Sequence, residues 1–219
     1  MSLLQVKDLV VEFPHRRGTL RALDHISFDI APGEILGVVG ESGAGKSLTG
    51  AAIIGLLEPP GRIAGGEILL EGQRIDKLPF DAMRHIRGRK IGAIFQDPLT
   101  SLNPLYTVGR QLTETIRAHL PVTEAEARRR AIGLLQDTGI PAAEQRIDHF
   151  PHQFSGGMRQ RVVIALALAA EPKLIVADEP TTALDVSIQA QIIQLLQRVC
   201  KERGAAVMLI THDMGVIAE

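Results

Sequence analysis

The sequence predicts an α/β fold that consists of a mostly parallel sheet, covering helices and a helical insertion. Short apolar runs alternate with helical patterns toward both ends of the chain, and only helical spacing is visible in the middle. Alternating strands and helices imply βαβ crossovers, in which neighbouring strands run parallel. A chain of 219 residues is long enough for one such domain with an inserted subdomain.

The composition excludes several classes of protein. Hydrophobic residues make up 45% of the chain and charged residues 22%, with a formal net charge of -1, which is typical of a soluble globular protein. This neutral balance argues against a nucleic-acid-binding surface, which normally carries a basic excess. A single cysteine, Cys200, excludes an internal disulfide and a zinc site built from cysteines. The longest apolar run, Val162 to Ala170, is far shorter than the roughly 20 residues of a membrane span, and no secretion leader follows Met1.

The first part of the chain is predicted to form strands, a glycine-rich loop and one helix. We expect strands over residues 3–11 and 22–30 and a short one over 67–70, because turn residues bound these runs. The run Ile35–Val39 is continuously apolar, which predicts a parallel strand buried on both faces. A helix is predicted over 46–57, before a Pro-Pro-Gly sequence that ends it.

The rest of the chain returns to strands after a long helical stretch. Residues 97–153 show helical spacing and no strand pattern, so we interpret them as a helical insertion. The helix predicted over 156–170 is apolar on every side in its second half, which indicates burial. Residues 188–199 fit an amphipathic helix, and the remaining strands are predicted at 91–95, 174–177 and 205–210.

A glycine-rich loop lies between a predicted strand and a predicted helix. The pattern G-x-x-x-x-G-K-[ST] matches in full at Gly40, Glu41, Ser42, Gly43, Ala44, Gly45, Lys46 and Ser47. Glycines let the backbone curl so that successive N–H groups point at phosphate oxygens, and the helix N-terminus adds its dipole. The Lys46 ammonium would neutralise charge on the β- and γ-phosphates, and the Ser47 hydroxyl would be a ligand for Mg²⁺. The segment therefore predicts a site for a nucleoside triphosphate and Mg²⁺, to which we add Leu48, the next residue of the helix.

Two carboxylates end the buried strand predicted over 174–177. Ligands bind at the carboxyl ends of strands in open α/β sheets, so Asp178 and Glu179 are expected to face the phosphates. Asp178 is a candidate to hold Mg²⁺ through water, and Glu179 is a candidate to polarise the attacking water. An isolated acidic pair is more often a solvated turn or a helix cap, but the phosphate loop earlier in the chain favours the catalytic interpretation.

Four further segments resemble motifs of the ATP-binding cassette (ABC) ATPases. Residues 154–160, Phe-Ser-Gly-Gly-Met-Arg-Gln, resemble the signature motif of that family, and residues 183–185, Ala-Leu-Asp, resemble its D-loop. Gln96, at the end of a predicted strand, is similar to the Q-loop glutamine, and His212 is similar to the switch histidine. The order and spacing of these motifs also agree with the family, and the resemblance covers the whole chain from Leu3.

A finer resemblance points to one branch of the family. The segments 95–104 and 155–161 are similar to the dipeptide, oligopeptide and nickel branch of ABC importers. The family resemblance implies a P-loop NTPase (RecA-like) core, an N-terminal antiparallel β subdomain and an inserted α-helical subdomain. It divides a single ABC ATPase domain of residues 1–219 into a core with the β subdomain, approximately 1–96 and 154–219, and a helical subdomain, approximately 97–153. Family members normally continue beyond the switch histidine, so we expect a C-terminal truncation that exposes a sheet edge.

The resemblance also assigns nucleotide contacts beyond the phosphate loop. Ser155, followed by Gly156 and Gly157 at a helix start, would form an anion site that closes over the ATP held by the opposite subunit. Asp185 would face the partner subunit, and capping of the helix that follows is the simpler alternative. Phe13, expected in the loop after the first strand, is similar to the aromatic residue that stacks on adenine, with a core or surface position as the alternative.

Two further residues take roles in hydrolysis and metal binding from the resemblance. Gln96 would sense Mg²⁺ or the attacking water, so it joins Ser47 and Asp178 as a candidate metal contact. His212 would hydrogen-bond the γ-phosphate and orient the water that Glu179 polarises. Without the family register, an exposed glutamine and a structural histidine are the commoner interpretations.

The function implied by the resemblance is that of an ATP-hydrolysing subunit of an importer for di- or oligopeptides, or for a related small solute such as nickel. ATP would join two such subunits, identical or paralogous, in a head-to-tail dimer and so move integral membrane permease subunits. An external solute-binding protein would deliver the solute to the permease. The implied location is peripheral, on the cytoplasmic side of the inner membrane. The alternative is a non-transport ABC ATPase that acts on DNA or the ribosome. Neutral charge and the lack of sustained heptads disfavour that alternative, so we expect no nucleic-acid partner.

Overall fold

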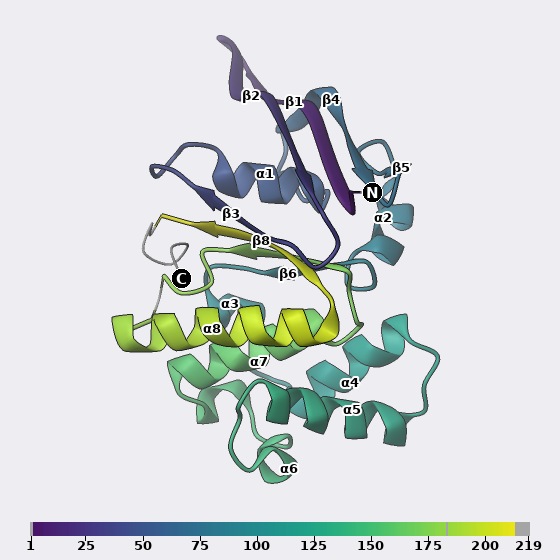
Figure 1. The fold of residues 1–219 in the computed structure, drawn as a ribbon, viewed down its shortest axis with the longest axis vertical. Coiled ribbons are helices and arrows are strands. Elements are labelled where there is room, and N and C mark those ends of the chain that lie inside the picture. Colours follow the sequence, from purple (N-terminus) through teal and green to yellow (C-terminus); the bar gives the residue numbers. More distant parts are fainter. Residues whose placement is uncertain (1, 183, 213–219) are drawn as a thin grey trace.

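The computed structural model describes residues 2–182 and 184–212, which fold around two sheets (Figure 1). One sheet is antiparallel with the strand order β2-β1-β4-β5, and the other is parallel with the order β3-β8-β7-β6. The antiparallel strands are β1 (Leu4–His15), β2 (Gly18–Ile30), β4 (Arg62–Leu70) and β5 (Gln73–Arg74). The parallel strands are β3 (Ile35–Val39), β6 (Ile91–Ile94), β7 (Leu174–Asp178) and β8 (Ala206–Thr211). The predicted fold class is confirmed.

Helices lie on both faces of the parallel sheet (Figure 1). One face carries α1 (Lys46–Ile53), and the other carries α7 (Gly156–Leu168) and α8 (Val186–Arg203). The stretch between β6 and α7 forms α3 (Pro98–Ser101), α4 (Val108–His119), α5 (Glu124–Asp137), α6 (Ala143–Arg146) and the 3-10 turn η1 (Pro151–Gln153). None of the helices in the described ranges has the length and hydropathy that crossing a membrane requires.

Strand alternation divides the apolar residues into two cores. In β7, Leu174 and Val176 pack in the cluster that contains α1 and the antiparallel sheet. Their neighbours Ile175 and Ala177 pack in the cluster that contains α7 and α8. Successive side chains of a strand point to opposite faces, so an uninterrupted apolar run is what a doubly covered strand requires.

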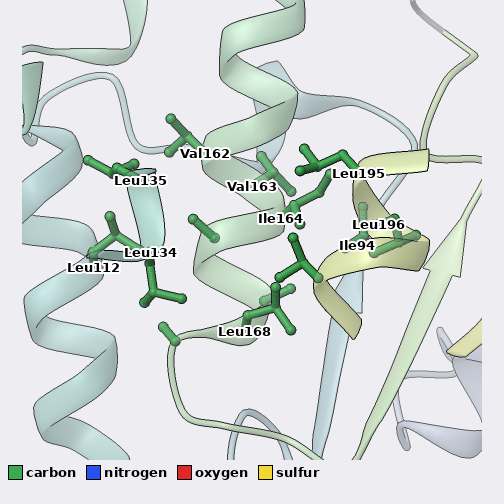
Figure 2. Packing of buried hydrophobic residues seen from close by; sticks show 14 of the residues in the cluster. Ile94, Leu112, Leu134, Leu135, Val162, Val163, Ile164, Leu168, Leu195 and Leu196 are labelled. Atoms are coloured by element: carbon green, nitrogen blue, oxygen red, sulfur yellow. The ribbon is translucent and has the colours of Figure 1, made fainter. Parts of the chain in front are cut away.

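The helices of the middle stretch have no separate core, because they pack on α7. Leu112 of α4 and Leu134 of α5 are buried in the same cluster as Val162 and Val163 of α7 (Figure 2). The other side of α7 contacts α8 and the sheet, which explains why its second half is apolar all round. The proposed division at residues 97 and 153 therefore separates segments that share one packed helix, and the division itself stays a prediction.

The prediction that Ile35–Val39 is buried on both faces was wrong. The strand β3 forms the edge of the parallel sheet and pairs with β8, and Ile35 and Val39 are each 39% exposed. An edge strand is covered by neighbours on one side of its backbone only. Strand order is a tertiary property, so an apolar run cannot distinguish a central strand from an edge strand.

Two helix predictions also differ from the structure. The helix α1 ends at Ile53 rather than at residue 57, because Gly55 has a φ of 66° and the Leu56 N–H donates to the Ala51 carbonyl at 2.8 Å. This is the glycine-based end that helices commonly use. The short helix α2 (Phe80–Ile86) was missed, since seven residues are too few to display a helical period.

Candidate functional site

The loop between β3 and α1 depends on glycine for its backbone path. Gly43 and Gly45 have φ angles of 83° and 84°, in the left-handed region that glycine adopts most easily. A Cβ atom at Gly45 would also lie 2.5 Å from Leu23 Cδ2 of β2, so the packing leaves no room for a side chain. Gly45 is the N-cap of α1 and provides no side-chain cap. The first N–H groups of the helix are therefore available for an anion such as phosphate.

The loop residues wrap around the side chain of Lys46. This lysine is only 8% exposed, and its Nζ donates to the carbonyl oxygens of Gly40 and Glu41 at 2.7 and 2.8 Å. A buried ammonium without an anionic partner is costly, and the two carbonyls offset part of that cost. The geometry holds a positive charge inside the loop, at the place where the sequence predicted phosphate binding.

Ser47 and Asp178 meet at the carboxyl end of β7. The Ser47 Oγ donates to the Asp178 Oδ1 at 2.8 Å, although the two residues are 131 positions apart. A hydroxyl and a carboxylate are the oxygen ligands that Mg²⁺ prefers, so these two side chains fit the metal contacts predicted for them. Lys46 and Glu179 add one charge of each sign beside this pair.

Burial raises the pKa of Asp178 above its ordinary value. The hydrogen bond from Ser47 opposes this shift, the negative charge of Glu179 adds to it, and the charge of Lys46 opposes it. Desolvation disfavours the ionised form of a carboxyl group, and a bound cation would restore it. The electrostatics of Asp178 therefore also fit a cation site.

Glu179 lies at the centre of the predicted hydrolytic residues. Its Oε2 accepts hydrogen bonds from Gln96 Nε2 at 3.3 Å and from Thr182 Oγ1 at 3.0 Å. Its Oε1 lies 3.5 Å from the Nδ1 of His212. The structure thus brings Gln96, Glu179 and His212 together from the ends of β6, β7 and β8. Gln96 contacts Glu179 rather than the Ser47–Asp178 pair, so its metal contact stays a prediction.

The backbone of Glu179 is held in an uncommon conformation. Its φ of 45° lies in the left-handed region, where residues other than glycine are rare. The Glu179 N–H donates to the Ile210 carbonyl at 2.9 Å, and the Glu179 carbonyl accepts from Thr182 at 3.3 Å. Residues in such strained conformations occur at functional sites, where the surrounding structure holds them. Thr182 was missed by the sequence analysis, and its position three residues after the glutamate in a Glu-Pro-Thr-Thr turn is the signal that could have found it.

Phe13 lies in a different place from the one predicted, because β1 extends to His15 and includes it. The half-buried ring lines a cavity of about 310 Å³ together with Ser47, Leu48 and Asp178. It also contacts Gly61, where a Cβ atom would lie 2.7 Å from Phe13 Cε1. The ring therefore packs against Gly61, just before β4, and also lines the cavity next to the start of α1. A contact with adenine stays a prediction for Phe13.

Ser155 is the N-cap of α7, at the helix start that the sequence predicted. Its side chain accepts a hydrogen bond from the Met158 N–H at 3.3 Å. A Cβ atom at Gly157 would lie 3.1 Å from Ile188 Cγ2, so glycine permits the close approach of α7 and α8 there. The helices α1 and α7 lie on opposite faces of the sheet (Figure 1). One chain therefore keeps Ser155 apart from its own phosphate loop.

Asp185 occupies the N-cap position of α8, but its side chain makes no cap hydrogen bond. Asp185 therefore has the N-cap position that the capping alternative predicted, but its side chain does not cap the helix. Its neighbour Leu184 approaches Gly156, with 3.8 Å between the leucine Cδ2 and a Cβ placed on the glycine. Ala183, the first residue of the predicted D-loop, lies outside the described residues, as do residues 213–219.

Comparison with known proteins decides the family. The family described as ABC transporter matches residues 23–182. This chain belongs to the ABC transporter family. The matched range contains the phosphate loop, Gln96, the signature segment and the Asp178–Glu179 pair of this ABC chain. The sequence-based recognition of the family is confirmed.

Curated relatives of the ABC chain carry peptide-transport names. The oligopeptide transport ATP-binding protein OppD of Bacillus subtilis is 52% identical over 99% of this chain and 61% of the relative. The dipeptide transport ATP-binding protein DppD of Escherichia coli is 48% identical over 100% of this chain and 67% of the relative. The chain thus spans about two thirds of the length of these curated relatives.

Solved structures similar to the ABC chain include dimeric cassettes. A dimeric ATP-binding cassette in a post-hydrolysis state, bound to ADP and Pi, has a TM-score of 0.85 and 32% identity. The match covers 97% of this chain and 89% of that one. The cbiO1 protein of Clostridium perfringens, described as part of an ABC transporter complex, has a TM-score of 0.81 and 31% identity over 99% of this chain and 80% of that one.

Proposed function

We propose that this ABC chain is the ATP-binding and ATP-hydrolysing subunit of an importer for di- or oligopeptides. The proposal rests on two clusters of side chains that meet at the carboxyl ends of the parallel strands. Lys46 and Ser47 at the start of α1 and Asp178 at the end of β7 form a charged cluster suited to a magnesium nucleotide. Glu179, the next residue, contacts Gln96 and His212. Binding groups and hydrolytic groups are thus supplied together by neighbouring strand ends.

Nucleotide binding would use the main chain of the loop and the side chains of Lys46 and Ser47. The N-terminal N–H groups of α1 would donate to phosphate oxygens, and Lys46 would exchange its two carbonyl partners for the phosphates. Ser47 and Asp178 would hold Mg²⁺, which neutralises charge on the β- and γ-phosphates when it is bound. Phe13 would border the base, since it lines a cavity with Ser47 and Leu48.

Hydrolysis would require Glu179 to exchange partners. In the described conformation its carboxylate is held by Gln96, Thr182 and His212. A general base must lie within hydrogen-bond reach of the water that it activates. Release of Gln96 from Glu179 would free an oxygen to accept a proton from water, while His212 would orient that water. The hydrogen bond between Gln96 and Glu179 therefore distinguishes a resting state from a reactive one.

A complete site would need a second chain. Ser155 begins a helix on the opposite face of the sheet from α1, so it would serve the nucleotide of a neighbouring subunit. The similar cassette bound to ADP and Pi is described as dimeric, which supports this arrangement. ATP would stabilise a head-to-tail dimer in which each loop faces the partner's signature helix, with the partner identical or paralogous.

A membrane partner would dock next to Gln96. A cavity of about 480 Å³ is lined by Phe95, Thr100 and Ser101 together with apolar residues of α7. Phe95, Leu99 and Leu105 are large apolar side chains that are 46%, 62% and 78% exposed. Phe95 lines the cavity itself, and Leu99 directly precedes the lining residue Thr100. Exposed apolar side chains beside a cavity are typical of a protein interaction site. A permease segment bound there would contact the same loop that carries Gln96, so docking and hydrolysis would be coupled.

The transport names of the relatives support a peptide importer over the alternative function. OppD and DppD are named for oligopeptide and dipeptide transport, and neither name refers to DNA or the ribosome. We infer a peripheral location at the cytoplasmic side of the membrane, where the permease would present its docking segment. Nickel remains the second substrate candidate, and an external solute-binding protein would deliver either solute.

Titration calorimetry with ATP and Mg²⁺ tests the proposal. Wild-type protein should bind ATP, and Lys46→Ala should weaken binding by about 10- to 100-fold, the value of a charge-assisted hydrogen bond. Lys77→Ala, which removes an exposed lysine, is the matched control and should bind like the wild type. Folded wild-type protein that takes up no ATP would refute the proposed function, and an unchanged affinity in Lys46→Ala would refute the role of this lysine.

A further inference from the structure

Gln160 of α7 is a fully buried amide without hydrogen-bond partners. Its side chain is 0% exposed, and both Nε2 and Oε1 are unpartnered. In the part of the chain that the structure describes, no other buried side-chain nitrogen or oxygen lacks a partner. Leaving such a group unpaired is unfavourable, because the amide loses its hydrogen bonds to water on burial. An apolar side chain of the same size would be the more stable choice at this position.

The direction of α7 relative to β6 locates the amide. Arg89 Nη1 donates to the carbonyl of Ala170 at 3.1 Å, and a Cβ at Gly92 would lie 2.5 Å from the carbonyl of Ala167. Arg89 lies just before β6 and Ala170 just after α7. The helix leads through a short connection into β7, which runs parallel to β6, so α7 is antiparallel to β6. Gln160 precedes Ala167 by seven residues, about two helical turns, and so lies on the same face of α7, toward β6.

The same geometry places Gln160 opposite the segment that carries Gln96. Seven helical residues span about 10.5 Å at 1.5 Å each, which corresponds to about three strand residues. Starting from Gly92, that distance reaches Phe95. The ladder between β6 and β7 ends at the pair Ile94–Ala177, so the backbone of Phe95 and Gln96 lies beyond it. The helix α3, which follows at once, is also in contact with α7.

We propose that Gln160 is a positioning residue for ATP hydrolysis, which rests on the proposed function. Its amide pairs with backbone groups of the Phe95–Asp97 segment when that segment leaves the conformation in which Gln96 binds Glu179. In this conformation Gln96 is bound to Glu179, and Gln160 has no partner. In the reactive one, Gln160 gains its hydrogen bonds as Gln96 releases Glu179. The unpaired amide thus destabilises the resting state selectively.

The proposal also links two motifs through one helix. Ser155 caps α7 and would bind the nucleotide of the partner chain, and Gln160 lies five residues further along the same helix. A rigid helix that moves when Ser155 engages the partner's nucleotide would carry the amide with it. Closure of the dimer would then change the contacts of Gln96 and, through Gln96, those of Glu179. Such coupling needs an element with two arrangements, and the unpaired amide supplies the bias between them.

The substitution Gln160→Met tests this role, because it keeps the length of the side chain and removes both polar atoms. We expect an equal or higher melting temperature, since an unpaired amide is lost from the resting state. We expect kcat for ATP hydrolysis to fall by about tenfold with an unchanged KM, because the reactive state loses its hydrogen bonds and binding does not. Ile164→Val, at a buried position on the next turn of α7, is the matched control. It should lower the melting temperature slightly and leave kcat unchanged.

The outcomes separate this inference from the proposed function. A Gln160→Met protein with wild-type kcat would overturn the inference while leaving the proposed function intact. A melting temperature well below that of the wild type would also overturn it, because the amide would then have partners in the resting state, such as an ordered water. Wild-type protein that fails to hydrolyse ATP would refute the proposed function and the inference together. A loss of kcat at unchanged KM with preserved stability is the supporting result.

Discussion

Glu179 shows how the site depends on single side chains. Its carboxylate binds Gln96, Thr182 and His212, while its backbone is strained at a φ of 45°. Residues held in such uncommon conformations persist only where the surrounding structure determines them. The convergence of three side chains on this one carboxylate supports the proposal that Glu179 is the hydrolytic residue.

The substitution Glu179→Gln should preserve ATP binding and lower turnover by about 100-fold or more, the usual contribution of a general base. Because the amide has nearly the size and shape of the carboxylate but cannot accept a proton from water, the protein should remain folded and accumulate as an ATP-bound dimer. Steady-state ATPase assays and analytical ultracentrifugation with ATP measure the two effects. Glu202→Gln, an exposed substitution on α8, serves as the control, and wild-type turnover in Glu179→Gln would remove this residue as the base.

Asp178 predicts a pH dependence of stability. Burial raises the pKa of Asp178, so the folded protein binds this proton more tightly than the unfolded chain does. The resulting stabilisation is present below the ordinary carboxyl range near pH 4 and is lost as the pH rises through the raised pKa. At pH 7 the ionised carboxylate therefore destabilises the protein in the absence of Mg²⁺.

Asp178→Asn should thus melt at a higher temperature than the wild type at pH 7 without nucleotide or metal. The difference should shrink as the pH falls toward about 4, where the wild-type carboxyl group is protonated as well. Differential scanning calorimetry across this range measures it. The same variant should lose the effect of Mg²⁺ on ATP binding, and a lower melting temperature at pH 7 would contradict the assigned electrostatics.

At the scale of elements, the start of α7 combines a structural and a functional role in Ser155. The serine caps the helix, and caps are common to many helices of this chain, such as α5 with Thr123. A cap alone therefore says little about function. What distinguishes α7 is the two glycines that follow, one of which permits α8 to approach within contact distance. A nucleotide contact at this exposed helix start is part of the proposed function.

Ser155→Ala and Thr123→Ala form a matched pair. Each removes a side-chain cap that accepts from a backbone N–H at 3.3 Å, so each should cost about 1 kcal/mol, or a decrease of about 2–4 °C in melting temperature. Only Ser155→Ala should also reduce ATP-driven dimerisation and turnover. Thermal melts and ATPase assays on both variants measure this. Equal activity in the two proteins would leave Ser155 as a cap and nothing more.

At the scale of the whole molecule, the helical stretch 97–153 and the sheet share α7 as a common support. Movement of the segment after Gln96 therefore reaches both the apolar surface at Leu99 and the carboxylate of Glu179. The proposed coupling between a permease and hydrolysis needs no long pathway, since the same short segment carries the exposed Leu99 and the Gln96 that contacts Glu179. This arrangement predicts that docking and catalysis can be disturbed separately on either side of Gln96.

Leu99→Glu should weaken association with permease subunits and leave ATP binding by the isolated protein unchanged. The charge is placed on an exposed leucine of α3, beside the cavity lined by Phe95 and Thr100. Leu20→Glu is the control, because Leu20 is similarly exposed at 59% but lies on β2 of the other sheet. Co-purification with cognate permease subunits measures the effect. Equal recovery of both variants would exclude α3 from the docking surface.

The sequence by itself determined the local parts of this protein. A phosphate loop is encoded by contiguous residues, because the φ angles of Gly43 and Gly45 and the start of α1 depend on near neighbours. The alternating strands and helices, the Asp178–Glu179 pair and the cap at Ser155 were predictable for the same reason. Family register then assigned Gln96 and His212, which the structure brings to the same carboxylate.

Tertiary structure alone decided which residues meet across the chain. The edge position of β3 and the unpaired amide of Gln160 both depend on strand order and helix packing. These properties arise from contacts between segments far apart in the sequence, so no local pattern reports them. A hydrophobic pattern predicts that a side chain is buried. Only the packed fold determines which residues surround that side chain and whether its polar atoms have hydrogen-bond partners.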